Sequence, residues 1–200
     1  MKKVLIDPGR CVGCMQCMFA CAVAHSQSKT LLGALLDKPR PRPRVHVGTT
    51  PDGRGFPNRC RHCDPAPCLA ACLPGAIFRD PDSGTVLIDP DRCIDCGSCA
   101  MACPFGVLRF HQDYTAPAGK EVAVKCDNCD QRQAQGLEPA CVEACMTGAL
   151  TFEEPDQALK RRTDQVSLLV LSGDEAQADL PAGLALLRAV KKATAEMNRR

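Results

Sequence analysis

Short apolar stretches, each followed by turn residues, recur along the first three quarters of the chain. Two of them are almost the same: residues 4–14 read VLIDPGRCVGC and residues 86–96 read VLIDPDRCIDC. In both, the β-branched run predicts a short strand, and the Asp-Pro pair predicts a turn that leads into a cysteine loop. Residues 67–77 and 140–150 also resemble each other, since a pair of cysteines precedes a Gly-Ala dipeptide in each. This repetition predicts a duplicated supersecondary unit.

The pattern changes after residue 155. The apolar run at 166–171 has the length of a strand, and apolar residues at helical spacing predict a helix from about 182 to 198. We expect this helix to pack on its own protein, with docking on a partner as the alternative. No apolar run approaches the length that a transmembrane helix needs, so direct membrane insertion is not expected.

Composition indicates how such a chain can be stabilised. Its 200 residues include 16 Cys but no Trp, one Tyr and six Phe. With so few large aromatic side chains, disulfides or metals become the expected source of much of the stability. The N-terminal residues MKKVLIDP show neither the apolar segment of a secretory signal nor a twin-arginine stretch, so a cytoplasmic location is expected. Thiols stay reduced there, which favours metal ligands over disulfides.

The cysteines fall into four groups of four, and none is left over. The groups are Cys11, Cys14, Cys17 and Cys21; Cys60, Cys63, Cys68 and Cys72; Cys93, Cys96, Cys99 and Cys103; and Cys126, Cys129, Cys141 and Cys145. Groups one and three have the spacing C-x2-C-x2-C-x3-C of bacterial two-cluster ferredoxins. In that spacing three thiolates wrap one [4Fe–4S] cube. The fourth cysteine, expected at the start of a helix, binds the other cluster.

Groups two and four keep the terminal C-x3-C but have longer loops before it. Such loops can still close on a cube, because extra loop length costs little free energy. Zinc is the main alternative, and group four alone fits two ligand pairs separated by a loop. Three cysteines within seven residues, as in groups one and three, suit a cube better than a zinc ion.

Other polar features leave alternatives open. His25 and His62 adjoin cysteine loops, where each either tunes a cluster or serves as a surface or capping residue. Lys38–Arg44 alternates Pro with cations, which predicts a stiff strip that either docks an acidic partner or remains a solvated loop. The net charge of +2 gives no reason to expect nucleic acid as a partner. No acid–base constellation, phosphate-binding loop or dinucleotide fingerprint is present, so no catalytic residue, flavin or NAD is expected.

Four segments carry a family resemblance: residues 20–26, 60–63, 101–106 and 125–129. Residues 1–153 resemble the four-cluster ferredoxin-like electron-transfer subunits of modular oxidoreductases. These subunits serve carbon monoxide dehydrogenase, formate dehydrogenase, formate hydrogenlyase, tungsten aldehyde oxidoreductase and the dimethyl sulfoxide reductase group. The short form is more similar to the partners of carbon monoxide dehydrogenase and aldehyde oxidoreductase.

The resemblance implies an α+β, loop-rich fold of two dicluster ferredoxin-like modules related by internal duplication. One module takes residues 1–30 with 114–155, and the other takes residues 57–113. A Pro/Arg-rich insertion occupies residues 31–56, and a tail with a short strand and a helix occupies residues 156–200.

The resemblance also implies crossed ligand sets for four [4Fe–4S] clusters. Site 1 consists of Cys11, Cys14, Cys17 and Cys145. Site 2 consists of Cys126, Cys129, Cys141 and Cys21. Site 3 consists of Cys60, Cys63, Cys68 and Cys103. Site 4 consists of Cys93, Cys96, Cys99 and Cys72.

The implied function is a non-catalytic electron-transfer subunit. It would relay electrons between a catalytic oxidoreductase subunit and a flavoprotein, ferredoxin or hydrogenase. A free-standing polyferredoxin and a zinc-stabilised interaction module are the alternatives.

Overall fold

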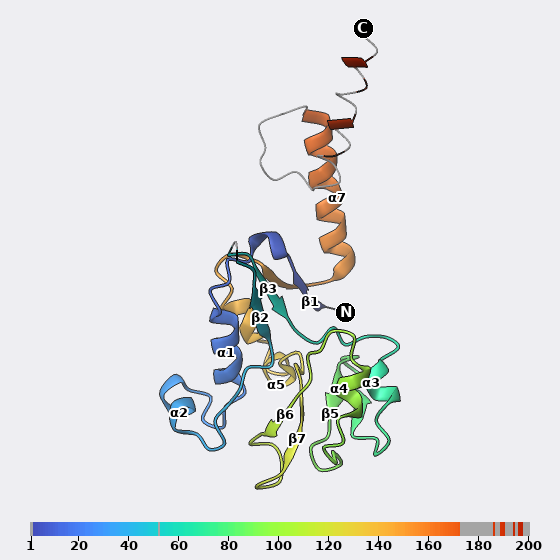
Figure 1. Cartoon of the computed structure of the whole chain (residues 1–200). Coiled ribbons are helices and arrows are strands. Elements are labelled where there is room, and N and C mark those ends of the chain that lie inside the picture. The colour runs from blue at the N-terminus through green and yellow to red at the C-terminus, as the bar shows by residue number, and fades with distance from the viewer. Residues whose placement is uncertain are drawn as a thin grey trace. The chain divides into compact units, whose positions relative to one another are not determined.

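The computed structural model describes residues 2–51 and 53–172, and beyond these only the positions 186, 189, 190, 194, 196 and 197 (Figure 1). The chain divides into two compact units, residues 1–153 and residues 154–200. The cysteine groups all belong to the first unit.

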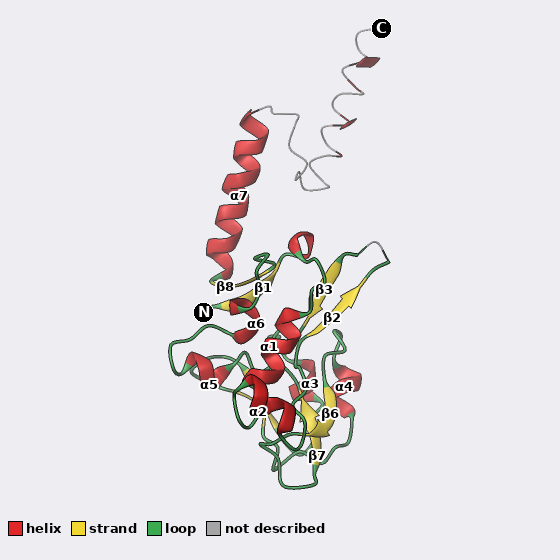
Figure 2. Ribbon diagram, turned by 90° about the vertical axis from the view of Figure 1, so that its left-hand side faces the viewer, coloured by secondary structure: helices red, strands yellow, loops and turns green. Residues whose placement is uncertain are grey.

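Short elements joined by long loops make up the first unit. Its strands are β1 (Lys3–Ile6), β2 (His46–Thr49), β3 (Gly55–Asn58), β4 (Ile77–Arg79), β5 (Val86–Ile88), β6 (Arg109–Gln112), β7 (Glu121–Val124) and β8 (Leu150–Glu153). Its helices are the 3-10 helix η1 (Pro8–Arg10), α1 (Gln16–Ala24), α2 (Leu31–Leu36), α3 (Pro67–Ala70), α4 (Ser98–Ala102), α5 (Asp130–Gln133) and α6 (Ala140–Glu143). This mixture of short strands and short helices agrees with the ferredoxin-like class that the family resemblance implies (Figure 2).

The strands form four antiparallel pairs: β1 with β8, β2 with β3, β4 with β5, and β6 with β7. The predicted strands of the repeated segments are confirmed as β1 and β5. In the first pair Val4 lies opposite Phe152, and in the third Ile77 lies opposite Ile88. Val4 and Ile77 are buried, so each pair turns one apolar face inward.

Helices pack beside two of these strand pairs in the same arrangement. α1 packs on α6, which adjoins β8, and α3 packs on α4 and adjoins β4. In Figure 1, α1 lies on the left of this unit, whereas α3 and α4 lie on its right. The segments that share sequence therefore share elements in the same order, a strand followed by a helix that carries cysteines.

Cysteines occupy much of the buried interior. One apolar cluster combines Val4 and Leu150 with Cys17, Cys21 and Cys141. A second, larger cluster contains Cys93 and Cys99 together with residues of β4, β5 and β7. The interior thus places thiols where an ordinary domain of this size has Leu, Ile or Phe, in line with the low aromatic content.

The expectation that the fourth cysteine begins a helix is wrong. Met15 and Gly97 have left-handed backbone angles (φ 61° and 77°) and form the N-terminal caps of α1 and α4. Because the helix starts right after this residue, it already includes the third cysteine. Cys21 consequently lies inside α1, and Cys103 directly follows α4.

Residues 154–200 contain α7 (Pro155–Ser172), so the strand expected at 166–171 is also wrong. A six-residue apolar run does not by itself distinguish a strand from a helix. Here Pro155 starts a helix, and the hydroxyls of Thr163 and Ser167 donate to carbonyls four residues back, at 3.0 and 2.9 Å. Most of the helix predicted at 182–198 lies outside the described residues. Within the described part of the chain, no helix has the length and apolar character needed to cross a membrane.

Candidate metal centres

All four cysteine groups begin with the same backbone turn. The second residue between the first two cysteines has a left-handed conformation in each group: Gly13 (φ 70°), His62 (φ 49°), Asp95 (φ 56°) and Asn128 (φ 62°). Gly adopts this conformation freely, and Asn, Asp and His tolerate it better than other side chains. Because the turn is the same in all four groups, each presents its first two thiols on the inside of a tight loop.

Backbone N–H groups point at sulfur in every predicted site. Their donor–Sγ distances are 3.4 Å for Leu150 to Cys145, 3.3 Å for Arg44 to Cys21, 3.4 Å for Asn128 to Cys126, 3.4 Å for His62 to Cys60 and 3.3 Å for Ala123 to Cys93. Such donors stabilise a thiolate relative to a thiol. They are also the groups that tune iron–sulfur clusters.

Two cavities gather the cysteines of sites 3 and 4. One cavity is lined by Cys60, Cys63, Cys68 and Cys103. The other is lined by Cys72, Cys93, Cys96 and Cys99. In each cavity, three cysteines of one group meet the last cysteine of another group.

Electrostatic contacts gather the cysteines of sites 1 and 2. Burial raises the pKa of the Cys17 thiol to about 11, opposed by the backbone N–H of Met18. The charges of three further thiols raise it too, those of Cys145, Cys11 and Cys14. Burial likewise raises the pKa of Cys21 well above its usual value, opposed by the backbone N–H of Arg44. The thiols that add to this shift are Cys126, Cys129 and Cys141.

The grouped cysteines are better explained as metal ligands than as free thiols. None of the sixteen cysteines forms a disulfide. Buried thiols whose pKa values are raised by one another cannot all ionise without a compensating positive charge. A metal centre supplies that charge and holds its thiolate ligands deprotonated. Four-sulfur donor sets with N–H groups aimed at the sulfurs fit a [4Fe–4S] cluster, with the cysteines as the residues that would hold it.

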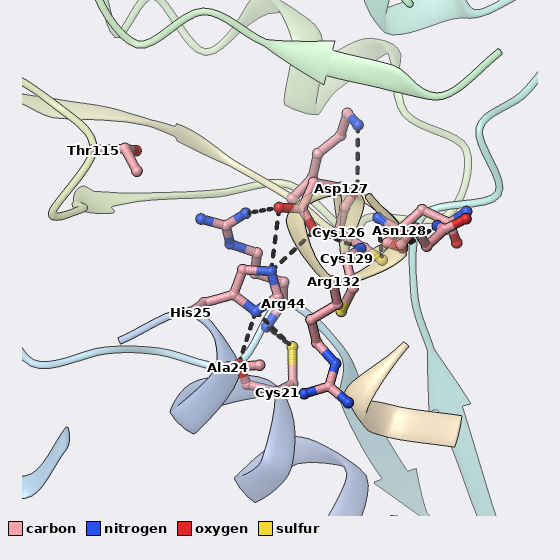
Figure 3. Close-up of polar contacts among 12 residues, drawn as sticks. Cys21, Ala24, His25, Arg44, Thr115, Cys126, Asp127, Asn128, Cys129 and Arg132 are labelled. Carbon is pink, nitrogen blue, oxygen red and sulfur yellow. Dashed lines mark hydrogen bonds and ion pairs between the residues drawn. The ribbon is translucent and has the colours of Figure 1, made fainter. Parts of the chain in front are cut away.

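His25 is buried against site 2, which favours the first of its two sequence interpretations. Its Nδ1 atom lies 2.8 Å from the carbonyl oxygen of Cys21 and 3.6 Å from the Sγ atom. Its Nε2 atom lies 2.9 Å from Oδ1 of Asp127 (Figure 3). His62 is also buried: its Nδ1 accepts from the N–H of Val86 at 3.2 Å, and burial lowers its pKa to about 3. His62 is therefore neutral.

Sequence reasoning missed three cations at these sites. Arg44 belongs to the Pro/Arg strip, yet its guanidinium turns inward, whereas Lys38, Arg40 and Arg42 are exposed. Arg59 and Lys125 are buried, with exposed fractions of 2% and 4%. The sequence does contain a pattern that indicates Arg59 and Lys125. A cation directly precedes the first cysteine of every group, at positions 10, 59, 92 and 125.

A comparison with known families identifies the chain. The model of the 4Fe-4S dicluster domain matches residues 52–155. The chain belongs to this family. The resemblance to [4Fe–4S] ferredoxin-like electron-transfer subunits is thereby confirmed.

Curated relatives match a larger share of this chain than the family model does. Protein NrfC of Escherichia coli (strain K12) is 40% identical over 153 residues, which cover 75% of this chain and 64% of NrfC. An iron-sulfur protein of Rhodospirillum rubrum is 38% identical, covering 76% of this chain and 82% of the relative. The thiosulfate reductase electron transfer subunit PhsB of Salmonella typhi is 36% identical, covering 78% and 77%. The chain spans less than two thirds of the length of NrfC but most of the other two.

Proposed function

We propose that this protein is a non-catalytic electron-transfer subunit of an oxidoreductase complex, and that it relays single electrons through four [4Fe–4S] clusters. The observation that carries the proposal is the gathering of sixteen free cysteines into four sulfur-lined places. Iron–sulfur clusters bound in this way take up and release one electron each. The chain's own residues hold and insulate the clusters.

The crossed ligand sets are part of this proposal. They are supported by the two cavities that each contain one complete set, and by the like-charge contacts of Cys17 and Cys21. The same pairing supports an internal duplication. In each half, a strand precedes a C-x2-C-x2-C loop and packs beside a second strand that follows a C-x3-C segment.

We infer that the sites form a line in the order 1, 2, 3, 4. Cys17 of site 1 lies in the same buried cluster as Cys21 and Cys141 of site 2, which joins sites 1 and 2. Cys126 of site 2 and Cys60 of site 3 share another buried cluster, which joins sites 2 and 3. Cys103 of site 3 packs against the apolar cluster that holds the cysteines of site 4.

The two outer sites of this line, sites 1 and 4, each contain an exposed cysteine. Cys14 of site 1 and Cys96 of site 4 are the two exposed cysteines, whereas the others are buried or partly buried. Large apolar side chains are exposed beside each of them, Val12 and Met15 next to Cys14, and Ile94 and Met101 near Cys96. Exposed apolar residues of this kind favour contact with another protein. One redox partner is therefore proposed for each end.

The partners are proposed by class. One is a catalytic oxidoreductase subunit, of the aldehyde oxidoreductase or carbon monoxide dehydrogenase type first, and of the formate dehydrogenase or hydrogenase type next. PhsB, which serves a thiosulfate reductase, adds reductases of that kind. The other partner is a flavoprotein, ferredoxin or hydrogenase. The cytoplasm remains the proposed compartment, because cluster ligands must stay reduced until they bind iron.

Metal analysis of the anaerobically purified protein tests this function. Four cubes require about sixteen iron and about sixteen sulfide per chain, and their one-electron reduction must produce electron paramagnetic resonance (EPR) signals. Zinc in place of iron favours the interaction module and contradicts the proposal. The native mass then separates a complex subunit from a free-standing polyferredoxin, which migrates as a single chain.

A further inference from the structure

Two buried cations lie between the two middle sites. Arg59 and Lys125 are the only Lys or Arg residues classed as buried among residues 2–51 and 53–172. A buried charge is costly unless an opposite charge or strong hydrogen bonds compensate it. The groups that contact Arg59 and Lys125 therefore indicate the role of their charges.

Arg59 is held against site 2. Its Nη2 atom donates to Sγ of Cys126 at 3.2 Å and to Oδ1 of Asn128 at 2.9 Å. Its Nη1 atom donates to the carbonyl oxygen of Val4 at 3.1 Å, and its Nε atom is buried without a hydrogen-bond partner. Within the described ranges no ion pair joins Arg59 to a carboxylate. Sγ of Cys126, a proposed cluster ligand, is the sulfur that its guanidinium contacts.

Lys125 acts on site 3. Its Nζ atom donates to the carbonyl oxygens of Val86 and Cys126, both of which are uncharged. Its side chain lines the cavity that Cys60, Cys63, Cys68 and Cys103 also line, which places its positive charge beside site 3. No carboxylate pairs with Lys125 in the part of the chain that the structure describes. Its charge, like that of Arg59, is free to act on the cluster ligands.

Each of the two cations precedes a cysteine of one site in sequence but lies against the other site in space. Arg59 directly precedes Cys60 of site 3 but touches Cys126 of site 2. Lys125 directly precedes Cys126 of site 2 but lines the cavity of site 3. The cations at the matching positions of the other two groups, Arg10 and Arg92, are exposed. Arg10 is also paired with Asp7 at 3.6 Å.

We propose that Arg59 and Lys125 raise the reduction potentials of sites 2 and 3, respectively. This inference rests on the proposed function. Reduction adds one negative charge to a cluster, and an unneutralised cation in a poorly polarisable interior stabilises that charge more than an exposed one does. Asp127, the carboxylate beside site 2, offsets little of this effect, because Arg44 pairs with it at 2.7 Å. The two middle sites thus hold an electron better than they would without these cations.

Anaerobic potentiometric titration of the full chain, followed by EPR, tests the inference. The variants are Arg59→Gln, Arg59→Lys, Lys125→Met and, as matched controls, Arg10→Gln and Arg92→Gln. The signal of site 2 is identified as the one altered in Cys141→Ser, and that of site 3 as the one altered in Cys68→Ser. We expect Arg59→Gln to lower the midpoint potential of site 2 and Lys125→Met to lower that of site 3. Arg59→Lys, which keeps the charge, and the two controls are expected to stay close to the wild-type values.

Several outcomes overturn the inference. One is that Arg59→Gln and Lys125→Met retain about sixteen iron but shift no midpoint more than Arg92→Gln does. Another is that Arg59→Lys shifts site 2 as far as Arg59→Gln, because the charge is then not the cause. If Arg59→Gln loses iron, Lys125→Met and Arg59→Lys decide the matter. A wild-type chain with fewer than four clusters contradicts the proposed function itself, whereas four clusters with unmoved midpoints contradict only this inference.

Discussion

Arg44 and Asp127 form an ion pair with 2.7 Å between Nη1 and Oδ2, which ties the Pro/Arg strip (Lys38–Arg44) to the fourth cysteine group. The same guanidinium donates to Oδ2 of Asp113 through Nη2 at 3.1 Å. The backbone N–H of Arg44 points at Sγ of Cys21. One residue of the Pro/Arg strip therefore connects three segments around site 2, two of them through partly buried charges.

Replacing Arg44 with Met is expected to destabilise residues 1–153 by about 3 kcal/mol. The reason is that two partly buried carboxylates lose their shared cation. The measurement is the free energy of unfolding in anaerobic denaturant titrations that follow both the cluster absorbance and circular dichroism. Arg42→Met, at an exposed position of the same strip, is the control and should change stability by less than about 0.5 kcal/mol. Equal effects of the two variants would contradict this account of Arg44.

Replacing Cys145 with Ala is expected to damage site 1 and to leave site 2 intact. Double variants make this result decisive, because two changes in one site are not additive. Cys145→Ala combined with Cys11→Ala should lose no more clusters than either single variant. Cys145→Ala combined with Cys126→Ala should lose two clusters. Iron analysis and EPR spin counts are the readouts, and the reverse pattern would show that the ligand sets are not crossed.

Replacing Asp95 with Val is expected to impair the loading of site 4, while Asp95→Gly is not. Asp95 is exposed and has φ 56°, so its side chain matters chiefly through the backbone angle. A β-branched residue in the left-handed region costs about 1–2 kcal/mol more than glycine. The measurement is the iron content of variants reconstituted under limiting iron. Ile94→Val, at the exposed neighbour, serves as the control, and similar loading of Asp95→Val and Asp95→Gly would refute the argument.

Removing iron is expected to unfold most of residues 1–153. The two larger apolar clusters in the interior of this unit include buried cysteines. Without metal, these thiols stabilise the interior less than large apolar side chains would. Chelator treatment should therefore abolish the protection of backbone amides in β1, β5, α1 and α4 from hydrogen exchange. A thiol reductant without a chelator should leave this protection unchanged, since no disulfide is present. Persistent protection of these amides after iron removal would contradict the prediction.

The cysteine loops could be predicted from sequence because their determinants are local. Three cysteines of each C-x2-C-x2-C loop lie within seven residues, and the turn that presents them depends on one left-handed residue. The strands β1 and β5 were predictable for the same reason, since each directly precedes its loop.

The inward turn of Arg44 was not predictable, because its partners Asp113 and Asp127 lie far along the chain. The exposed Lys38 and Arg42 belong to the same strip, and nothing in the sequence distinguishes them from Arg44. The helix α7 was missed for a related reason. Its apolar run at 166–171 matches both a strand and a helix, and the polar residues ahead of it decide between them.

The antiparallel pairing of β1 with β8 has a consequence for how the protein matures during synthesis. A nascent chain that has emerged as far as residue 124 holds every proposed ligand of sites 3 and 4, whose last cysteine is Cys103. It cannot complete sites 1 and 2, because Cys126, Cys129, Cys141 and Cys145 have not yet been made. Until β8 emerges, β1 is an unpaired edge strand, and Cys11, Cys14 and Cys17 wait for their fourth ligand. Under the proposed pairing, the ligand sets of sites 3 and 4 are therefore complete before those of sites 1 and 2, and the thiols of Cys11, Cys14 and Cys17 spend the longest part of translation without their fourth ligand.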